Sequence, residues 1–405
     1  MNIPLLFSLL SVLGVFQVWL GKRSGSSTSS SDDYFLMGRK VGLFSLVMTL
    51  LATQIGGGAL MGAAEEAYKY GWIVLCYPMG MVLGMALLGL GFGAKFRKMQ
   101  LSTVAEVFEK VYGSVPLRKF ASILSIVSLF FILVAQAIAA KKFFLSLGFS
   151  TPWLFIALWM TLVFYTAFGG LKAVIQTDIL QAGFILAAFL IAFLGKTPNL
   201  PEVSASFSSS APWLTWMFMP LFFMLIEQDM GQRCFAAKSP RTVTYAALIA
   251  AGVLFFVSLF PIYFGQLARS LSILPGESVL MTSIAAFTSP TVFTILIAAI
   301  LMAIVSTADS LLCSISSNIA CDFFQKRESL SLCRWLTFAV GASTLLLSFC
   351  FDNVVSMLMF SYQLSVSILF VPIIMALIWK KPSKKIAYTA MIIGAMAFFS
   401  KFLLT

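Results

Sequence analysis

Residues 52–58 read ATQIGGG and lie within an apolar stretch that extends from residue 43 to residue 64. Gly56, Gly57 and Gly58 disfavour a helix, because each glycine costs about 1 kcal/mol relative to alanine in a helix interior. Inside a bilayer, backbone carbonyls freed by such an interruption can hold a cation. Small residues also allow two membrane helices to pack closely. The stretch therefore predicts either an interrupted membrane helix or a close helix contact.

The composition is that of a membrane protein. Of the 405 residues, 60% are hydrophobic and 10% are charged, whereas about a quarter of the residues of a soluble domain are charged. The mean hydropathy is +0.98. At about twenty apolar residues per span, the chain has room for a dozen spans. We predict an all-α polytopic membrane protein with about 12 transmembrane helices, at residues 3–20, 43–64, 72–94, 120–140, 151–169, 174–195, 212–229, 243–267, 290–318, 333–350, 355–379 and 386–404.

The basic residues predict the orientation of these helices. The net charge of +12 does not indicate a nucleic-acid partner, because the basic residues form short clusters between the apolar runs. If the first helix starts outside, 21 of the 27 lysines and arginines fall in inner loops, as the positive-inside rule requires. We therefore expect a multi-pass protein of a bacterial inner (plasma) membrane with both termini outside. The six outer residues are Lys69, Lys141, Lys142, Lys196, Arg269 and Lys401.

The residues needed for common enzyme chemistry are scarce. The chain has no histidine, the usual acid–base group near neutral pH, and its six cysteines show no metal-type or redox-type spacing. We expect no enzymatic activity. We also expect the segment 102–112 to form an interfacial helix on the cytoplasmic side, because it has helical spacing.

The ninth apolar run carries hydroxyl groups on one helical face. Ala303, Ser306, Thr307 and Ser310 share that face at 100° per residue. Two hydroxyls and a carbonyl there offer hard oxygen ligands for a monovalent cation, but such hydroxyls also bond back to the preceding turn. Asp309 favours a functional interpretation, because a carboxylate at membrane depth is expensive.

Other acidic residues have two interpretations each. Asp178 follows a glycine pair and starts the sixth run. There it either has a functional role or interacts favourably with the helix dipole. The seventh run is interrupted by Pro220 and ends in Glu227 and Asp229. This acidic pair either lines a pathway or lies at the membrane interface beside Arg233, and we favour the interface for Asp229.

Four motifs together resemble the sodium:solute symporter family, which includes sodium symporters of proline, sialic acid, galactose or glucose, and choline. They are DYFLMGR at 33–39, the glycine-pair segment at 165–178, QRCFAAKS at 232–239, and AIVSTADS at 303–310. The resemblance runs from about residue 33 to residue 380. It implies the leucine-transporter-type fold of two inverted five-helix repeats. The domains implied are an extra N-terminal helix and linker (1–42), a first repeat (43–195), a second repeat (196–379) and an extra C-terminal helix (380–405).

The resemblance also implies positions for the ligands. The family's principal sodium site falls on the carbonyls of Ala52, Ile55 and Ala303 and the hydroxyls of Ser306 and Thr307. A residue corresponding to Asp178 contributes to a second sodium site or to coupling in some members. The interruption of the seventh run rests on Pro220 or on local unwinding. Candidate substrate contacts, each of which could instead be a helix–helix hydrogen bond, are Gln54, Gln136, Tyr362 and Gln363.

The implied function is sodium-coupled symport. We expect Na⁺ to be the coupling ion and a small organic solute, such as an amino acid, carboxylate or vitamin, to be imported across the bilayer. The alternative is a proton-coupled solute symporter on the same fold. The sequence does not identify the solute or the oligomeric state.

Overall fold

The computed structural model describes residues 2–26, 28, 30–149, 151–194, 211–273, 277–324, 329–352, 354–379 and 382–404. In these ranges the chain is almost entirely helical, and each of the twelve predicted apolar runs coincides with helix. Eight helices there are long and apolar enough to cross a membrane, and two of them, 58–99 and 153–193, each contain two of the predicted runs or parts of them. The predicted boundary between the repeats, at residues 195 and 196, lies outside the described residues.

The first half of the chain contains two helices that change direction sharply. The helix Ala63–Tyr70 ends at Gly71, whose positive φ of 79° stops it before the chain continues at Gly71–Leu75. The long helix α9 contains Gly170 at φ 57°, and a side chain there would meet the carbonyl oxygen of Tyr34. The elements are α1 (Ile3–Ser26), α2 (Ser31–Leu36), η1 (Met37–Arg39), α3 (Leu43–Gln54), η2 (Gly58–Gly62), α4 (Ala63–Tyr70), η3 (Gly71–Leu75), α5 (Cys76–Leu87), η4 (Leu88–Phe92), α6 (Gly93–Met99), α7 (Glu106–Tyr112), α8 (Val115–Ser146) and α9 (Trp153–Leu194).

In the second half, serine caps followed by proline begin two of the long helices. Ser239 accepts a hydrogen bond from the N–H of Thr242, and Ser289 accepts one from Val292, with proline at the first helical position in both. The elements are α10 (Trp213–Met224), α11 (Gln228–Ala236), α12 (Pro240–Leu267), η5 (Ala268–Ser270), α13 (Val279–Phe287), α14 (Pro290–Phe323), α15 (Leu330–Leu347), α16 (Val354–Ile378) and α17 (Lys384–Leu404).

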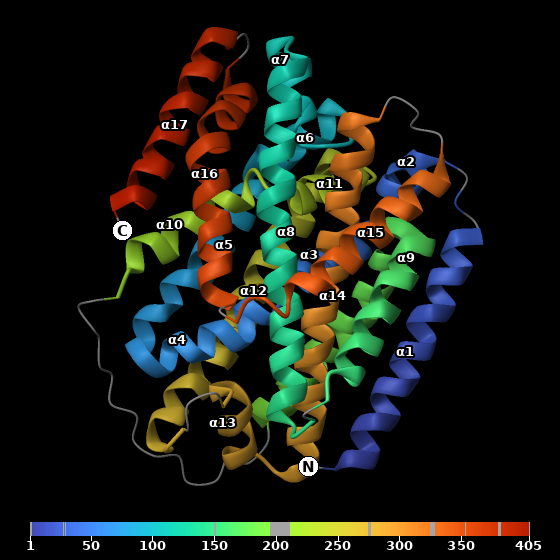
Figure 1. The fold of residues 1–405 in the computed structure, drawn as a ribbon, viewed down its shortest axis with the longest axis vertical. Coiled ribbons are helices and arrows are strands. Elements are labelled where there is room, and N and C mark those ends of the chain that lie inside the picture. Colours follow the sequence, from blue (N-terminus) through green and yellow to red (C-terminus); the bar gives the residue numbers. More distant parts are fainter. Residues whose placement is uncertain are drawn as a thin grey trace.

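Helix α14 forms the centre of the molecule. Every residue from 296 to 318 is buried, and the helix packs against α8, α9 and α3. Helix α1 lies along α9 at one edge, and α17 lies beside α16 at the other edge (Figure 1). The polar face predicted for the ninth run is therefore enclosed by other helices and does not face lipid.

Two short helices differ from the sequence-based expectation. The interfacial helix expected at 102–112 is present as α7, but it begins at Glu106, after a turn at residues 102–105. Helix α13 was not predicted, because its nine residues are too few for a span and it lies between two apolar runs.

Candidate functional site

The helix formed by the second apolar run is interrupted at two residues. α3 ends at Gln54, Ile55 is non-helical at ψ 74°, and helical backbone resumes at Gly57. The glycines allow close approach as well as a break. A β-carbon on Gly56 would lie 2.6 Å from the hydroxyl oxygen of Thr307, and one on Gly58 would overlap a methyl group of Leu358. The N–H of Gly57 donates to the side-chain oxygen of Gln136 at 2.8 Å, so one freed backbone group has a partner.

The seventh run is interrupted at Leu225–Glu227. Of the two predicted origins of the interruption, Pro220 is wrong, and the structure has local unwinding instead. Pro220 lies inside α10, which continues to Met224. Proline removes one backbone hydrogen bond, and neighbouring helices can compensate for that loss without ending the helix. The N–H groups of the actual break bond to the preceding turn, since Leu225 donates to Phe222 at 3.2 Å and Glu227 donates to Phe223 at 2.9 Å.

Hydroxyls of α14 meet carbonyls of α3 at the first break. The Oγ of Ser306 lies 2.9 Å from the carbonyl oxygen of Ala52 and 3.0 Å from that of Ala303. The Oγ1 of Thr307 lies 3.3 Å from the Ala52 carbonyl, 3.0 Å from the Thr53 carbonyl and 3.2 Å from the Ala303 carbonyl. The structure thus brings together four of the five predicted ligands in direct contact, and sequence reasoning missed the carbonyl of Thr53.

The chemistry of these oxygens fits a monovalent cation. Ala52, Ala303 and Ser306 are fully buried and Thr307 is 6% exposed, so bulk water does not surround the group. Neutral carbonyl and hydroxyl oxygens are hard ligands without formal charge, which suits a singly charged cation. Ile55, the fifth predicted ligand, lies buried at the break itself. Within the described chain, no group of three histidine, cysteine, aspartate or glutamate side chains could hold a metal ion.

A buried ion pair lies one to two helical turns from the hydroxyls. Asp178 and Arg233 are fully buried, with Nη2 of the arginine 3.5 Å from Oδ2 of the aspartate. The same carboxylate oxygen accepts from Thr49 at 2.5 Å, and Thr49 in turn accepts from Nε of Arg233 at 2.9 Å. Ser310, predicted to share the cation-binding face, instead accepts from Nη2 of Arg233 at 2.5 Å and lies 3.2 Å from Thr53. The Arg233 guanidinium therefore contacts Oδ2 of Asp178, while Oδ1 is buried without a hydrogen-bond partner.

Asp309 adjoins this group, since the Ser310 hydroxyl also lies 3.4 Å from its Oδ1. Its Oδ2 accepts from the Tyr165 hydroxyl at 2.5 Å and lies 3.5 Å from the Thr177 hydroxyl. Both partners are on α9, so this carboxylate joins the central helix α14 to α9. It is fully buried.

A narrow cavity lies between the two interrupted helices and contains most of the predicted substrate contacts. Gln54, Gln136 and Tyr362 line it, together with Thr307 from the candidate cation site. Gln363 is not among its lining residues and is only half-buried. The water-accessible volume is about 30 Å³, which is room for about two water molecules. An organic solute therefore fits only after the surrounding helices have moved apart.

Two acidic residues complete the cavity. Glu227 and Asp229 line it and are 8% and 1% exposed. The interface position favoured for Asp229 does not fit the structure, because α11 turns this buried residue into the cavity, whereas the expected nearness of Arg233 is confirmed. The carboxylate of Asp229 accepts from the N–H of Met230 at 2.6 Å, and Arg233 bonds only its backbone carbonyl, at 3.0 Å. The sequence signal for both residues was an acidic pair at the end of an apolar run.

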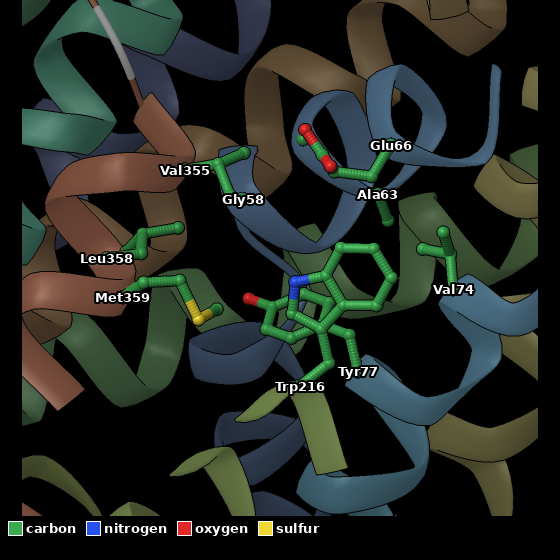
Figure 2. Close-up of a pocket in the computed structure, with 10 residues that line it drawn as sticks. Gly58, Ala63, Glu66, Val74, Tyr77, Trp216, Val355, Leu358 and Met359 are labelled. Atoms are coloured by element: carbon green, nitrogen blue, oxygen red, sulfur yellow. The ribbon is translucent and has the colours of Figure 1, made fainter. Parts of the chain in front are cut away.

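A second pocket adjoins the cavity. Figure 2 shows Tyr77 and Trp216 facing Leu358 and Met359 across it, with Glu66 at the rim. Gly58, Tyr77 and Leu358 line both spaces. Tyr77 and Leu358 therefore form the partition between the central cavity and this second pocket.

Known proteins share both the sequence pattern and the fold. The pattern of the sodium:solute symporter family matches residues 34–198 and 192–394. A sodium/pantothenate symporter of Haemophilus influenzae is 24% identical, covering 97% of this chain and 88% of that protein. The high-affinity choline transporter 1 of Drosophila melanogaster is 24% identical over 66% of this chain. This chain spans about half of that transporter, 45% of its length.

A solved structure of a Na⁺-coupled sialic acid symporter, in a substrate-bound outward-open state, matches 97% of this chain and 95% of its own. The TM-score is 0.75 at 19% sequence identity, so the two share a fold, and the predicted leucine-transporter-type architecture is confirmed. The family pattern covers most of the chain and confirms the resemblance drawn from the four motifs. The chain belongs to the sodium:solute symporter family.

Proposed function

We propose that this protein is a sodium-coupled secondary active symporter that imports a small organic solute across a bacterial inner membrane. The observation that carries the proposal is the contact of the Ser306 and Thr307 hydroxyls with the carbonyls of Ala52 and Ala303. These oxygens belong to α3 and α14, so a sodium ion bound among them would connect an interrupted helix to the buried central helix. The family assignment supports sodium as the ion and a small molecule as the cargo.

Coupling follows from where the ion would bind. Thr307 contributes to the candidate sodium site and also lines the cavity. An ion that stabilises one arrangement of α3 against α14 also stabilises the cavity shape that belongs to that arrangement. Sodium and solute then favour the same conformation, and each raises the affinity for the other by the same factor.

Sodium-dependent thermal stability of the purified protein tests the proposal. A ligand that binds only the folded state stabilises it by RT ln(1 + [L]/Kd), about 2.7 kcal/mol at a hundred times Kd. We expect sodium chloride to raise the unfolding temperature above that in potassium chloride at equal ionic strength. Thr307→Ala should abolish the difference. Ser316→Ala is the matched control, since Ser316 is a buried hydroxyl of the same helix that bonds only back to Leu312, at 2.7 Å.

One result would contradict sodium coupling, and another would contradict the position of the sodium site. Equal unfolding temperatures in the two salts would remove the basis for the site. A sodium effect that survives Thr307→Ala and disappears in Ser316→Ala would place the ion elsewhere on α14.

A proton-coupled symporter on the same fold is the second candidate. The observation in its favour is the number of buried carboxyl groups near the cavity, namely Asp178, Glu227, Asp229 and Asp309. Uptake into proteoliposomes decides between the two, because only a proton-coupled protein accumulates solute from a pH gradient without sodium.

For Asp178 we propose a coupling role rather than a second sodium site. The guanidinium of Arg233 lies 3.5 Å from the carboxylate, and the Thr49 hydroxyl also contacts it. A sodium ion there would have to displace or closely approach a fixed positive charge, at a large electrostatic cost. The pair instead connects α9, α3 and α11, which carry both interrupted segments.

A further inference from the structure

We propose that the solute of the central cavity is a small organic cation that carries an ammonium group. This inference rests on the proposed transport function and names the class of solute. It is carried by the charges that line the cavity, by the absence of an opposing charge among the described lining residues, and by the aromatic side chains around them.

The carboxyl groups of Glu227 and Asp229 lie beside each other at the second helix break. Both residues line the cavity, together with Gln54. Two neighbouring buried carboxyl groups do not both ionise readily, so the pair carries at most one negative charge. An unpaired charge at membrane depth is expensive, and a cationic solute would neutralise it.

No basic side chain opposes this charge among the described residues that line the cavity. The nearest is Arg233, whose side chain is fully buried. Its Nε donates to Thr49, its Nη1 to the backbone carbonyl of Asp229, and its Nη2 to Ser310 and Asp178. All three nitrogens therefore have partners, and none contacts the acidic pair's carboxylates.

The charge balance of the surrounding core points the same way. Four fully or nearly buried carboxyl groups, those of Asp178, Glu227, Asp229 and Asp309, accompany a single guanidinium, that of Arg233. A sodium ion beside Thr307 adds one positive charge. The formal negative charge of the four carboxyl groups would still exceed the positive charge of the guanidinium and the sodium ion. Shared protons reduce this excess, and a bound ammonium reduces it further without an additional proton.

Aromatic rings surround the acidic pair. Tyr77 and Tyr362 line the cavity, and the ring of Phe223 packs against Tyr362 with centroids 4.6 Å apart. Trp216 lines the adjoining pocket with Tyr77 (Figure 2). Aromatic faces attract ammonium groups by about 0.5–2 kcal/mol each. A carboxylate combined with aromatic walls is therefore suited to an amine or quaternary ammonium.

Other solute classes fit these residues less well. An anion such as pantothenate, the solute in the name of one relative, would meet two carboxyl groups and no fixed positive charge in the described lining. A polyhydroxylated sugar could donate hydrogen bonds to the carboxylates. It would leave the negative charge uncompensated.

Matched pairs of probes that differ in charge test the inference. Thermal unfolding of the full-length protein is followed in sodium chloride with choline against 3,3-dimethylbutanol, and with ethanolamine against 1-propanol. Pantothenate and glucose represent the other classes. We expect at least one ammonium compound to raise the unfolding temperature while its uncharged partner does not.

The acidic pair is tested by isosteric variants. Glu227→Gln and Asp229→Asn should each raise the dissociation constant of the effective ammonium compound by at least about tenfold, equivalent to 1.4 kcal/mol. The control Asp352→Asn should not, because this carboxylate is 88% exposed and pairs with Lys141 away from the cavity.

The outcomes separate the solute class from the transport function. Stabilisation by sodium, with no response to either ammonium compound, overturns this inference and leaves sodium symport intact. Stabilisation by pantothenate or glucose instead overturns it as well. A rise in unfolding temperature with an ammonium compound that is lost in Glu227→Gln supports the inference. It does so even if sodium has no effect, a result that would contradict sodium coupling alone.

Discussion

The guanidinium of Arg233 and the carboxylate of Asp178, with Nη2 and Oδ2 3.5 Å apart, form a fully buried ion pair between α11 and α9. Thr49 of α3 contacts both side chains. Three helices that carry or support the interrupted segments therefore meet at one charge pair. Removing one partner leaves an uncompensated buried charge, which costs more than removing both.

The first prediction concerns this pair. Asp178→Asn and Arg233→Met should each lower the free energy of unfolding by about 3–5 kcal/mol, and the double variant should lose less than the sum. Denaturant unfolding of the purified protein measures all three. Lys69→Met is the control, because Lys69 is 56% exposed at its pair with Glu66, and such a pair contributes about 1 kcal/mol or less. Strictly additive losses would contradict the coupling.

The second prediction concerns the close approach at the first helix break. A β-carbon in Gly56→Ala would lie 2.6 Å from Oγ1 and 3.0 Å from Cβ of Thr307. We expect the hydroxyl to be displaced and the apparent sodium affinity to fall by at least about tenfold, or 1.4 kcal/mol. Sodium titration of the unfolding temperature measures this.

Gly252→Ala is the matched control for that substitution. This glycine lies in α12, and nothing lies within 4 Å of the position that a β-carbon would take there, so alanine should stabilise the helix by up to about 1 kcal/mol. Its sodium affinity should not change. If Gly56→Ala binds sodium with the same affinity as the unsubstituted protein, the contact with Thr307 does not shape the site.

The third prediction follows from the position of Pro220. Since α10 continues past this residue to Met224, Pro220→Ala should restore one backbone hydrogen bond and leave the break at Leu225–Glu227 in place. Apparent sodium affinity should change by less than about threefold, which is below 1 kcal/mol. A large loss of sodium affinity would mean that the bend at Pro220 sets the geometry of the site.

Gln228→Ala contrasts with Pro220→Ala, because the Gln228 side chain makes contacts at the second helix break. The Gln228 side chain accepts from the N–H of Val104 at 2.7 Å and donates to the carbonyl of Ser102 at 3.3 Å. These contacts fix the start of α11. Their removal leaves a buried N–H unsatisfied, so we expect a loss of about 1–3 kcal/mol in the free energy of unfolding.

Apolar periodicity and length were sufficient to predict the long helices. Each predicted run coincides with helix because a bilayer span needs about twenty apolar residues and leaves few alternatives. The hydroxyl face of α14 was also predictable, since Ser306 and Thr307 are fixed on one side by the helical repeat. The contact between that face and α3 was predicted from the family resemblance and not from the helical repeat.

The second break and the acidic pair were not predictable in the same way. Leu225, Ile226 and Glu227 include no glycine or proline, so no local propensity marks them. Their backbone is held by bonds to the preceding turn and by Gln228, which reaches a turn more than a hundred residues away in sequence. The direction of Asp229 depends on where α11 restarts, and a shift of two residues would turn it by about 200°.

The last prediction concerns the C-terminal end of α14. Asp322 accepts from Arg118 at 2.8 Å, from Ser122 at 2.7 Å and from Thr103 at 2.8 Å, which joins α14 to α8 and to the turn before α7. If the C-terminal end of α14 moves away from α8, these three contacts of Asp322 break. We expect Asp322→Asn to weaken the closed arrangement and to raise the rate at which N-ethylmaleimide labels the neighbouring Cys321, which is 8% exposed.

The expected increase is at least about fivefold, since 1–2 kcal/mol changes a population by a factor of about 5–30. Mass spectrometry of the peptide that contains Cys321 separates it from the other cysteines. Glu109→Gln is the control, because Glu109 contacts the same Arg118 at 2.6 Å but is 43% exposed, so water replaces the lost contact. Faster labelling in Glu109→Gln than in Asp322→Asn would show that the exposed carboxylate, and not the buried one, keeps this end closed.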